Sequence, residues 1–115
     1  MAEPGVVRNH DGAYRYDTEK NKWSSLRSLP QPNRGLSAVA DGRRMYLLGG
    51  YTDKGFSPDV FAFDLSGQTY QQVAALPFAL LGFELVVSGH SVYIAGGEDK
   101  PRGRSGRLLF AELPR

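Results

Sequence analysis

The sequence contains no cysteine, which excludes disulfides, thiolate nucleophiles and cysteine-ligated metals. It leaves the compartment open, because exported proteins can also lack cysteine. Histidine is nearly as scarce: His10 and His90 are the only two, and both fall in expected turns. Because of that placement, we expect neither a metal site nor a catalytic histidine. No cofactor is expected either.

Long apolar runs and arginine-rich tails are absent as well. Only residues 100–107 are locally positive, which fits either a solvated loop or an anion-binding site. The longest apolar run, Leu76 to Leu81, is too short to cross a membrane and contains a proline. Residues 1–5 lack the basic and apolar regions of a signal peptide, so none is expected. The net charge is +2 with interspersed signs, which predicts neither a membrane nor a nucleic-acid partner.

Glycine is abundant, with 14 residues, and proline adds 7, so many turns and short strands are expected. An internal repeat is the strongest signal, because positions 47 residues apart match without a gap. The matches pair Tyr16-Asp17 with Phe63-Asp64, Trp23 with Tyr70, Leu29-Pro30 with Leu76-Pro77, Gly35 with Gly82, and Gly49-Gly50 with Gly96-Gly97. A third copy begins at Leu108-Leu109-Phe110, where Ala111 replaces the aspartate.

The repeat reads as β-structure throughout. Segments 44–48 and 91–95 are rich in β-forming residues and each ends at a double glycine. Segment 59–65 alternates apolar and polar residues, and no window keeps helical spacing. The sequence therefore predicts four short strands in each repeat.

The pattern Tyr16-Asp17, Trp23, Leu29-Pro30, Arg34-Gly35 and Tyr46 to Gly50 resembles a kelch motif. The resemblance implies an all-β fold of kelch-type β-propeller blades, with between two and three blades in residues 1–115. We expect a c–d strand pair at 13–29, a full blade at 36–75 and strands a, b and c of the next blade at 83–112. The aromatics before each aspartate, with Trp23 and Tyr70, are expected to pack between blades.

A propeller needs more blades than this, typically 4 to 8. The ring is therefore expected to be incomplete, completed by other blades, or assembled from copies of the chain. A heterologous interface between copies would close such a ring and remove its exposed strand edges.

In an antiparallel blade the b–c and d–a loops open on the same face. These loops are expected at 51–58 and 98–106, and at 30–35 and 77–82. Loops on a rigid scaffold commonly carry function. The residues that gather on this face are Arg34, Asp53, Lys54, Glu98, Lys100, Arg102 and Arg104.

Glu98 and Arg104 are the candidate catalytic pair. A glutamate near cations can act as a general acid or base, and a guanidinium can bind a carboxylate with two hydrogen bonds. The alternative is a surface ion pair of little energetic value.

The segment Gly97-Glu98-x-Lys100-Pro101-x-x-Arg104 resembles a loop of the bacterial sialic acid mutarotases, also called N-acetylneuraminate epimerases, which are kelch propellers. The resemblance implies that Glu98 is the acid/base and that Arg104 holds the substrate carboxylate. Arg34, Lys100 and Arg102, which are expected on the same face, are the candidate substrate-binding residues. The implied substrate is an acidic sugar, sialic acid, and members of that family are often periplasmic. A non-catalytic kelch module that binds protein or carbohydrate is the competing hypothesis, and an inactive propeller fragment is a third.

Overall fold

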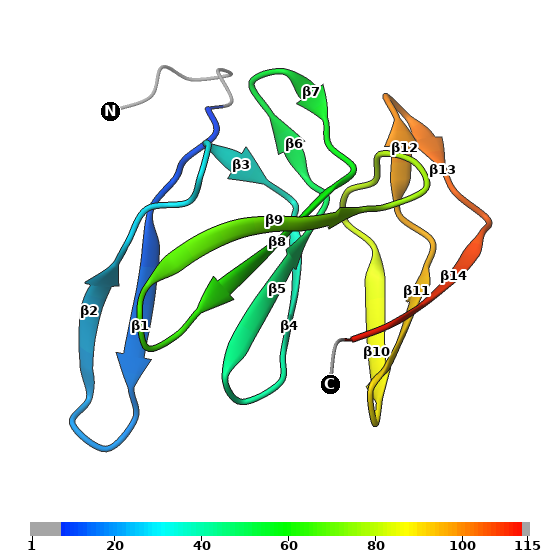
Figure 1. The fold of residues 1–115 in the computed structure, drawn as a ribbon. Helices are drawn as coiled ribbons and strands as arrows, with labels where there is room; N and C mark the ends of the chain where they lie inside the picture. Colours follow the sequence, from blue (N-terminus) through cyan, green and yellow to red (C-terminus); the bar gives the residue numbers. More distant parts are fainter. Residues whose placement is uncertain (1–7, 114–115) are drawn as a thin grey trace.

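A computed structural model describes residues 8–113 of the chain. The regular elements of this part are all β-strands, arranged as side-by-side antiparallel sheets (Figure 1). This confirms the predicted all-β class. Residues 1–5, in which no signal peptide was expected, lie outside the described residues.

The central sheet has four strands in the order β4-β5-β8-β9. Its strands are β4 (Ser37–Ala40), β5 (Arg44–Leu48), β8 (Asp59–Asp64) and β9 (Thr69–Ala75). Side chains alternate between the two faces of a strand, and in β8 this directs Val60 and Ala62 into the core. The sheet is a meander whose consecutive long strands are hydrogen-bonded neighbours, as in a propeller blade.

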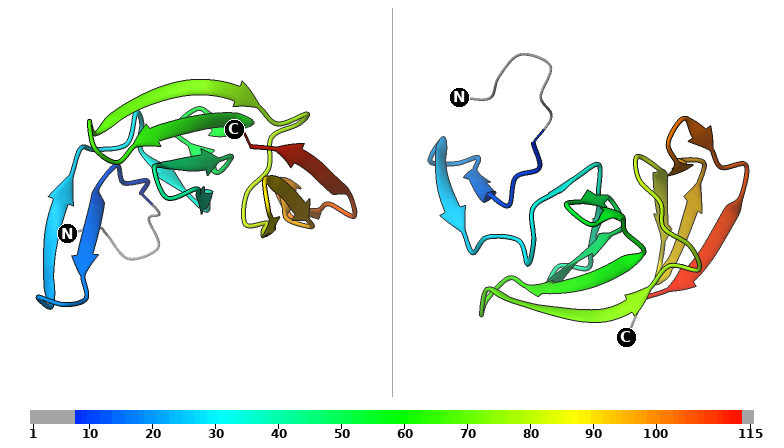
Figure 2. Two further views of the ribbon diagram at one scale, coloured as in Figure 1. Left: turned by 60° about the horizontal axis from the view of Figure 1, so that its bottom comes forward. Right: turned by 90° about the horizontal axis from the view of Figure 1, so that it is seen from above.

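Smaller sheets flank the central one on both sides (Figure 2). On one side β1 (Ala13–Asp17) pairs with β2 (Lys22–Leu26). On the other side β10 (Glu84–Ser88), β11 (Ser91–Ala95) and β14 (Leu108–Glu112) form a three-stranded sheet in that order. The sheets therefore hold two, four and three long strands, and β10 lies against β4.

The apolar core lies between the central sheet and the β10-β11-β14 sheet. Leu80, in the connection between these sheets, is only 1% exposed. The backbone of the connection is fixed too, because the Gly50 N–H donates to the Leu80 carbonyl at 2.8 Å. The remaining core residues come from the facing strands and the start of the second sheet: Val39, Tyr46, Leu48, Val60, Ala62, Phe83, Val92 and Ile94.

Two small sheets stand at one end of the long strands, in segments where the sequence predicted loops. The first contains β3 (Asn33–Arg34), β6 (Tyr51–Thr52) and β7 (Gly55–Phe56). The second is the hairpin of β12 (Glu98–Lys100) and β13 (Gly103–Arg104). Cross-strand hydrogen bonds thus give these expected loops a defined shape, and both small sheets lie at the top of Figure 1.

The aromatic pairs of the repeat meet across their strands. Phe63 stacks on Tyr70 with ring centroids 4.6 Å apart, and Tyr16 stacks on Trp23 at 5.0 Å. Phe63 is buried, at 3% exposed, as predicted, and the Tyr70 hydroxyl donates to the Arg27 carbonyl at 2.7 Å. The expectation of burial is wrong for Trp23, which is 70% exposed, because no described strand covers the outer face of the β1–β2 hairpin.

The aspartate of each repeat closes a turn between two long strands. The Asp64 carboxylate accepts hydrogen bonds from the Ser66 N–H at 2.9 Å, the Ser66 hydroxyl at 2.7 Å and the Gly67 N–H at 3.0 Å. Asp17 accepts from the N–H groups two and three residues later in the same way. The repeated aspartate therefore satisfies turn N–H groups that the strands leave unpaired.

Replacing Asp64 with Ala is expected to lower the melting temperature at neutral pH. Hydrogen bonds from Gly67 first, and then Ser66, hold the pKa of Asp64 below its usual value of 3.8. A carboxylate with a depressed pKa stabilises the fold above that value, and the contribution is lost as the pH falls through the folded-state pKa. The difference in melting temperature between wild type and Asp64→Ala should therefore shrink below about pH 3.8.

Thermal unfolding followed by circular dichroism from pH 7 downwards checks this prediction. Asp11→Ala is the matched control, because no hydrogen bond to the Asp11 side chain is found in residues 8–113. An equal effect of the two substitutions, or a difference that stays constant down to pH 2.5, would contradict the proposed role of Asp64.

Candidate functional site

The β12–β13 hairpin positions the two candidate catalytic residues. Gly97 precedes it with φ +89°, a conformation that suits glycine. The turn at its tip has Pro101 followed by Arg102 at φ +59°, which matches the type II pattern of proline followed by a left-handed residue. The chain then returns so that Glu98 and Arg104 are cross-strand partners.

Glu98 and Arg104 are in direct contact. Arg104 Nη1 lies 3.5 Å from Glu98 Oε2, the single ion pair among residues 8–113. The Glu98 side chain is 24% exposed and the Arg104 side chain 81%. The carboxylate is thus held at the protein surface beside a guanidinium whose remaining donors face solvent.

The other charged residues of the hairpin contribute in different ways. Arg102 reaches Glu98 through its backbone, since its N–H donates to Glu98 Oε1 at 2.9 Å. The Lys100 side chain extends across Gly103, where the aliphatic part of the lysine packs. In the structure, both oxygens of the Glu98 carboxylate therefore have a donor from the hairpin itself.

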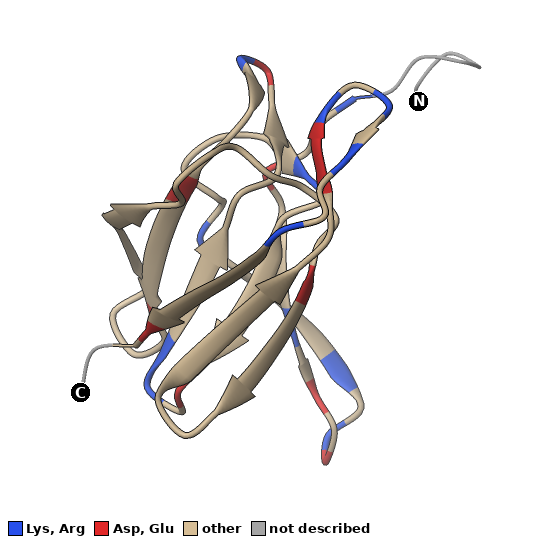
Figure 3. Cartoon of the chain, turned by 90° about the vertical axis from the view of Figure 1, so that its right-hand side faces the viewer, with Lys and Arg blue, Asp and Glu red and all other residues tan. Residues whose placement is uncertain are grey.

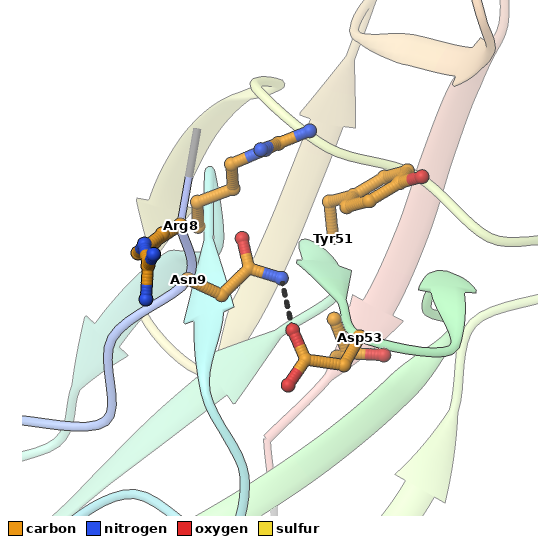
Figure 4. A pocket seen from close by; sticks show the side chains of 6 residues that line it. Arg8, Asn9, Tyr51 and Asp53 are labelled. Atoms are coloured by element: carbon orange, nitrogen blue, oxygen red, sulfur yellow. Dashed lines mark hydrogen bonds between the residues drawn. The ribbon is translucent and has the colours of Figure 1, made fainter. Parts of the chain in front are cut away.

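Arg34 lies away from this pair, in strand β3 of the first small sheet. Its guanidinium carbon sits 4.4 Å from the centre of the Tyr51 ring, a distance suited to a cation–π contact. The two residues border an open pocket of about 590 Å³ (Figure 4). Its other lining residues are Arg8, Asn9, Thr52 and Asp53.

The two small sheets occupy equivalent places in successive blades. Arg34 pairs with Tyr51, and Leu81 pairs with Glu98 in the same antiparallel manner, each residue being 47 positions after its counterpart. Gly82 N–H donates to the Gly35 carbonyl at 2.9 Å and joins the two connections. Tyr51 and Glu98 therefore stand on the same end of the molecule, one blade apart.

Sequence reasoning missed Arg8, Asn9 and Tyr51 as residues of this pocket. Tyr51 was detectable, because the repeat places it in register with Glu98. Arg8 and Asn9 precede the first matched position, and the bridge between His10 and Asn33 brings them to the pocket.

Charged residues lie largely in the turns and hairpins, and the long strands are mostly free of them (Figure 3). Within residues 8–113 no three metal-binding side chains gather into a candidate site. The same part of the chain contains no helix suited to crossing a bilayer.

Comparison with known proteins identifies the repeat. Residues 32–77 match the family model of the Kelch motif. Kelch-like protein 25 of Rattus norvegicus is 28% identical over 69 residues, which are 60% of this chain and 12% of that protein. Alpha-scruin of Limulus polyphemus is 49% identical over 37 residues, or 32% of this chain and 4% of scruin. The chain thus matches a small part of these relatives and carries kelch-type β-propeller blades.

The fold has a counterpart among solved structures. The structure of YjhT superposes with a TM-score of 0.80 at 17% identity, over 89% of this chain and 40% of that one. At this identity the likeness shows the fold alone. The chain spans less than half of the YjhT chain.

Proposed function

We propose that the chain contributes to an acidic-sugar site in which Glu98 and Arg104 catalyse interconversion of sialic acid anomers. The observation that supports this is the 3.5 Å contact between the two side chains on one short hairpin. The spacing of these residues is the one that resembles the sialic acid mutarotases, and the YjhT likeness supports the fold that the site requires.

The reaction needs one positioned acid/base. The Glu98 carboxylate takes the proton of the anomeric hydroxyl, the bond between the anomeric carbon and the ring oxygen breaks, and the anomeric carbon becomes a carbonyl. The proton passes to the ring oxygen, directly or through water. Rotation of the open chain and the reverse steps close the ring on the other face.

Arg104 fits the second role because most of its guanidinium is exposed. Arg104 Nη1 faces Glu98, and the other donors of the fork are free to bind the substrate carboxylate. Saturation-transfer NMR of N-acetylneuraminate checks the activity, since protein that catalyses the reaction must raise the exchange rate between the α and β anomer signals. Exchange equal to that in buffer would contradict the proposal.

A non-catalytic binding module is the second candidate function. The relatives detected by sequence are kelch-like proteins and a scruin, and exposed hairpins on a rigid propeller are suited to contacting a partner. Binding of N-acetylneuraminate without faster anomer exchange would favour this candidate over the mutarotase.

We also propose that copies of the chain cover the open faces of the described blades. Trp23 is exposed at one end of the row of sheets, and Leu108 and Phe110 are exposed on β14 at the other. The repeat places β14 in register with β8, which carries β9 on its outer edge, whereas the outer edge of β14 has no strand partner among residues 8–113. Unpaired edges and apolar faces at opposite ends favour a head-to-tail ring.

Light scattering of the 115-residue chain tests this assembly. We expect a mass of at least two chains of 12.6 kDa each, and Phe110→Lys should reduce it towards the monomer because a charge on β14 opposes strand addition. His90→Lys, in the exposed β10–β11 turn, is the matched control. A stable monomer of the wild-type chain would contradict self-assembly and favour blades supplied by another polypeptide segment.

A further inference from the structure

A largely apolar groove of about 410 Å³ lies between the end of β9 and strand β14. Its walls come from residues 73–77, from residues 109–113 and from the core strands between them. β14 is the outer strand of its sheet (Figure 2), and no strand pairs with its outer edge among residues 8–113. The groove and an unpaired strand edge therefore lie side by side.

The preceding junction between sheets shows what covers such a place. Tyr70 of β9 lies opposite Phe63 of β8, and its hydroxyl donates to the Arg27 carbonyl at 2.7 Å. Gln68 contacts the same residue, because its Oε1 accepts from the Arg27 N–H at 2.9 Å. Strand β9 thus joins the central sheet to the end of the β1–β2 hairpin.

Strand β14 is the counterpart of β8, with a shift of one residue from the match seen in the sequence. Met45 pairs with Phe63 in the central sheet. Val92, 47 residues after Met45, pairs with Ala111 and not with Phe110. Ala111 therefore takes the place of Phe63, and it is exposed where it lines the groove. Its small side chain leaves room where the central sheet has an aromatic ring.

The groove also contains the counterpart of the residue that Tyr70 contacts. Ala74 lies 47 residues after Arg27 and lines the groove together with Ala111. An aromatic side chain opposite Ala111 would therefore lie against Ala74, as Tyr70 lies against Arg27. The strand that carried it would pair with the free backbone groups along the edge of β14.

We propose that β14 and this groove bind one extended segment of another polypeptide, antiparallel to β14, with a tyrosine opposite Ala111. The segment extends the β10-β11-β14 sheet, and the tyrosine fills the groove with its hydroxyl at the Ala74 carbonyl. In strand addition, main-chain hydrogen bonds supply affinity and side-chain pockets supply specificity. The proposal needs neither the Glu98 chemistry nor the ring of copies, which would cover the opposite face at Leu108 and Phe110.

A folded second copy is a poor source of this strand. Its β9 is already paired with β8, and its β2 is paired with β1 through one edge. β2 could join β14 in an antiparallel manner only through its other edge. That pairing would turn the side of the hairpin with Trp23, the counterpart of Tyr70, away from the groove. A free extended segment has no such constraint.

Fluorescence anisotropy with the full chain and a labelled peptide of residues 66–76 tests the proposal, because this sequence contains the strand that covers β8. We expect the peptide to bind. Tyr70→Ser in the peptide should weaken binding about tenfold or more, and Tyr70→Phe about threefold through loss of one hydrogen bond.

Two protein variants locate the binding site. Val73→Lys places a charge in the groove wall and should weaken peptide binding about fivefold or more. Val87→Lys, at a valine of similar exposure on β10, is the matched control and should leave binding unchanged. Equal effects of the two substitutions would overturn the assignment to the groove.

Two methylated peptides distinguish strand addition from binding of the tyrosine side chain alone. Each is methylated at the alternate backbone N–H groups of one edge, and only the peptide methylated on the edge that faces β14 should lose binding. Equal effects of the two methylations, no binding of the unmodified peptide, or full binding of the Tyr70→Ser peptide would overturn the proposal. Self-association of the wild-type chain that excludes the peptide would assign the groove to a second copy and overturn it too.

Discussion

Glu98→Gln is expected to abolish catalysed anomer exchange of N-acetylneuraminate while leaving the blades folded. Glutamine keeps the size of the side chain, and its amide oxygen can still accept from the Arg102 N–H, which now donates at 2.9 Å. It cannot take a proton from the anomeric hydroxyl. General acid–base catalysis contributes about 10²- to 10⁴-fold, so the catalysed rate should fall by that factor. Exchange NMR on matched wild-type and variant samples measures it.

Two further variants distinguish a catalytic role of the Glu98 carboxylate from a structural role in the hairpin. Arg104→Lys keeps the charge but loses the planar fork, so it should weaken substrate binding more than it slows the bound substrate. Arg102→Gly keeps the N–H that bonds to Glu98 and relieves the left-handed backbone at φ +59°, so it should retain the exchange activity. Glu98→Gln with wild-type exchange, or Arg102→Gly as damaging as Glu98→Gln, would show that the carboxylate is not the acid/base.

Most of the fold could be predicted from the repeat, because the residues that define it act on structure nearby in the chain. A double glycine that ends a strand, an aspartate that closes a turn and an aromatic before it each act within a few residues. The same features appear in the structure at Asp17 and Asp64 and at their neighbouring aromatics. The repeat could not show which of its copies have their aromatic side chains covered by neighbouring strands. Burial was therefore predicted correctly for Phe63 and wrongly for Trp23.

The candidate site was less accessible to sequence reasoning. Strand order was enough to group Arg34 with Glu98 and Arg104 on one end of the molecule. It could not show that Arg34 stacks on Tyr51 one blade away, or that Arg102 contacts Glu98 through its backbone N–H. Those outcomes depend on hairpin geometry within segments that the sequence indicated only as loops. The roles of Glu98, Arg104 and Arg102 in binding or catalysis are proposals that the variants above test, and those of Arg34 and Lys100 stay proposals.

Gly49→Ala is expected to destabilise the chain strongly. The equivalent substitution in the next repeat, Gly96→Ala, is the control. Gly49 has φ +67° and Gly96, its counterpart 47 residues later, has φ +73°. Alanine in this left-handed region costs about 1–2 kcal/mol at either position. At Gly49 a Cβ would also collide with the Leu80 carbonyl and approach the Phe83 ring at 3.1 Å. Overpacking of this kind adds about 1–3 kcal/mol.

Around Gly96 the described residues leave open space within 4 Å of an added Cβ. Gly96→Ala in a monomer should therefore show only the backbone cost, and urea unfolding should place it between wild type and Gly49→Ala. Equal losses at the two positions in a monomer would contradict the collision with Leu80 as the cause.

The Gly49→Ala and Gly96→Ala variants also test assembly. Leu80, whose carbonyl lies against Gly49, belongs to the connection into the next blade. If a further blade packs against β10-β11-β14, its connection should approach Gly96 as Leu80 approaches Gly49. Gly96→Ala would then lower both the stability and the mass measured by light scattering. A Gly96→Ala chain that assembles like wild type would show that any neighbour on this side does not repeat the blade-to-blade packing seen at Gly49.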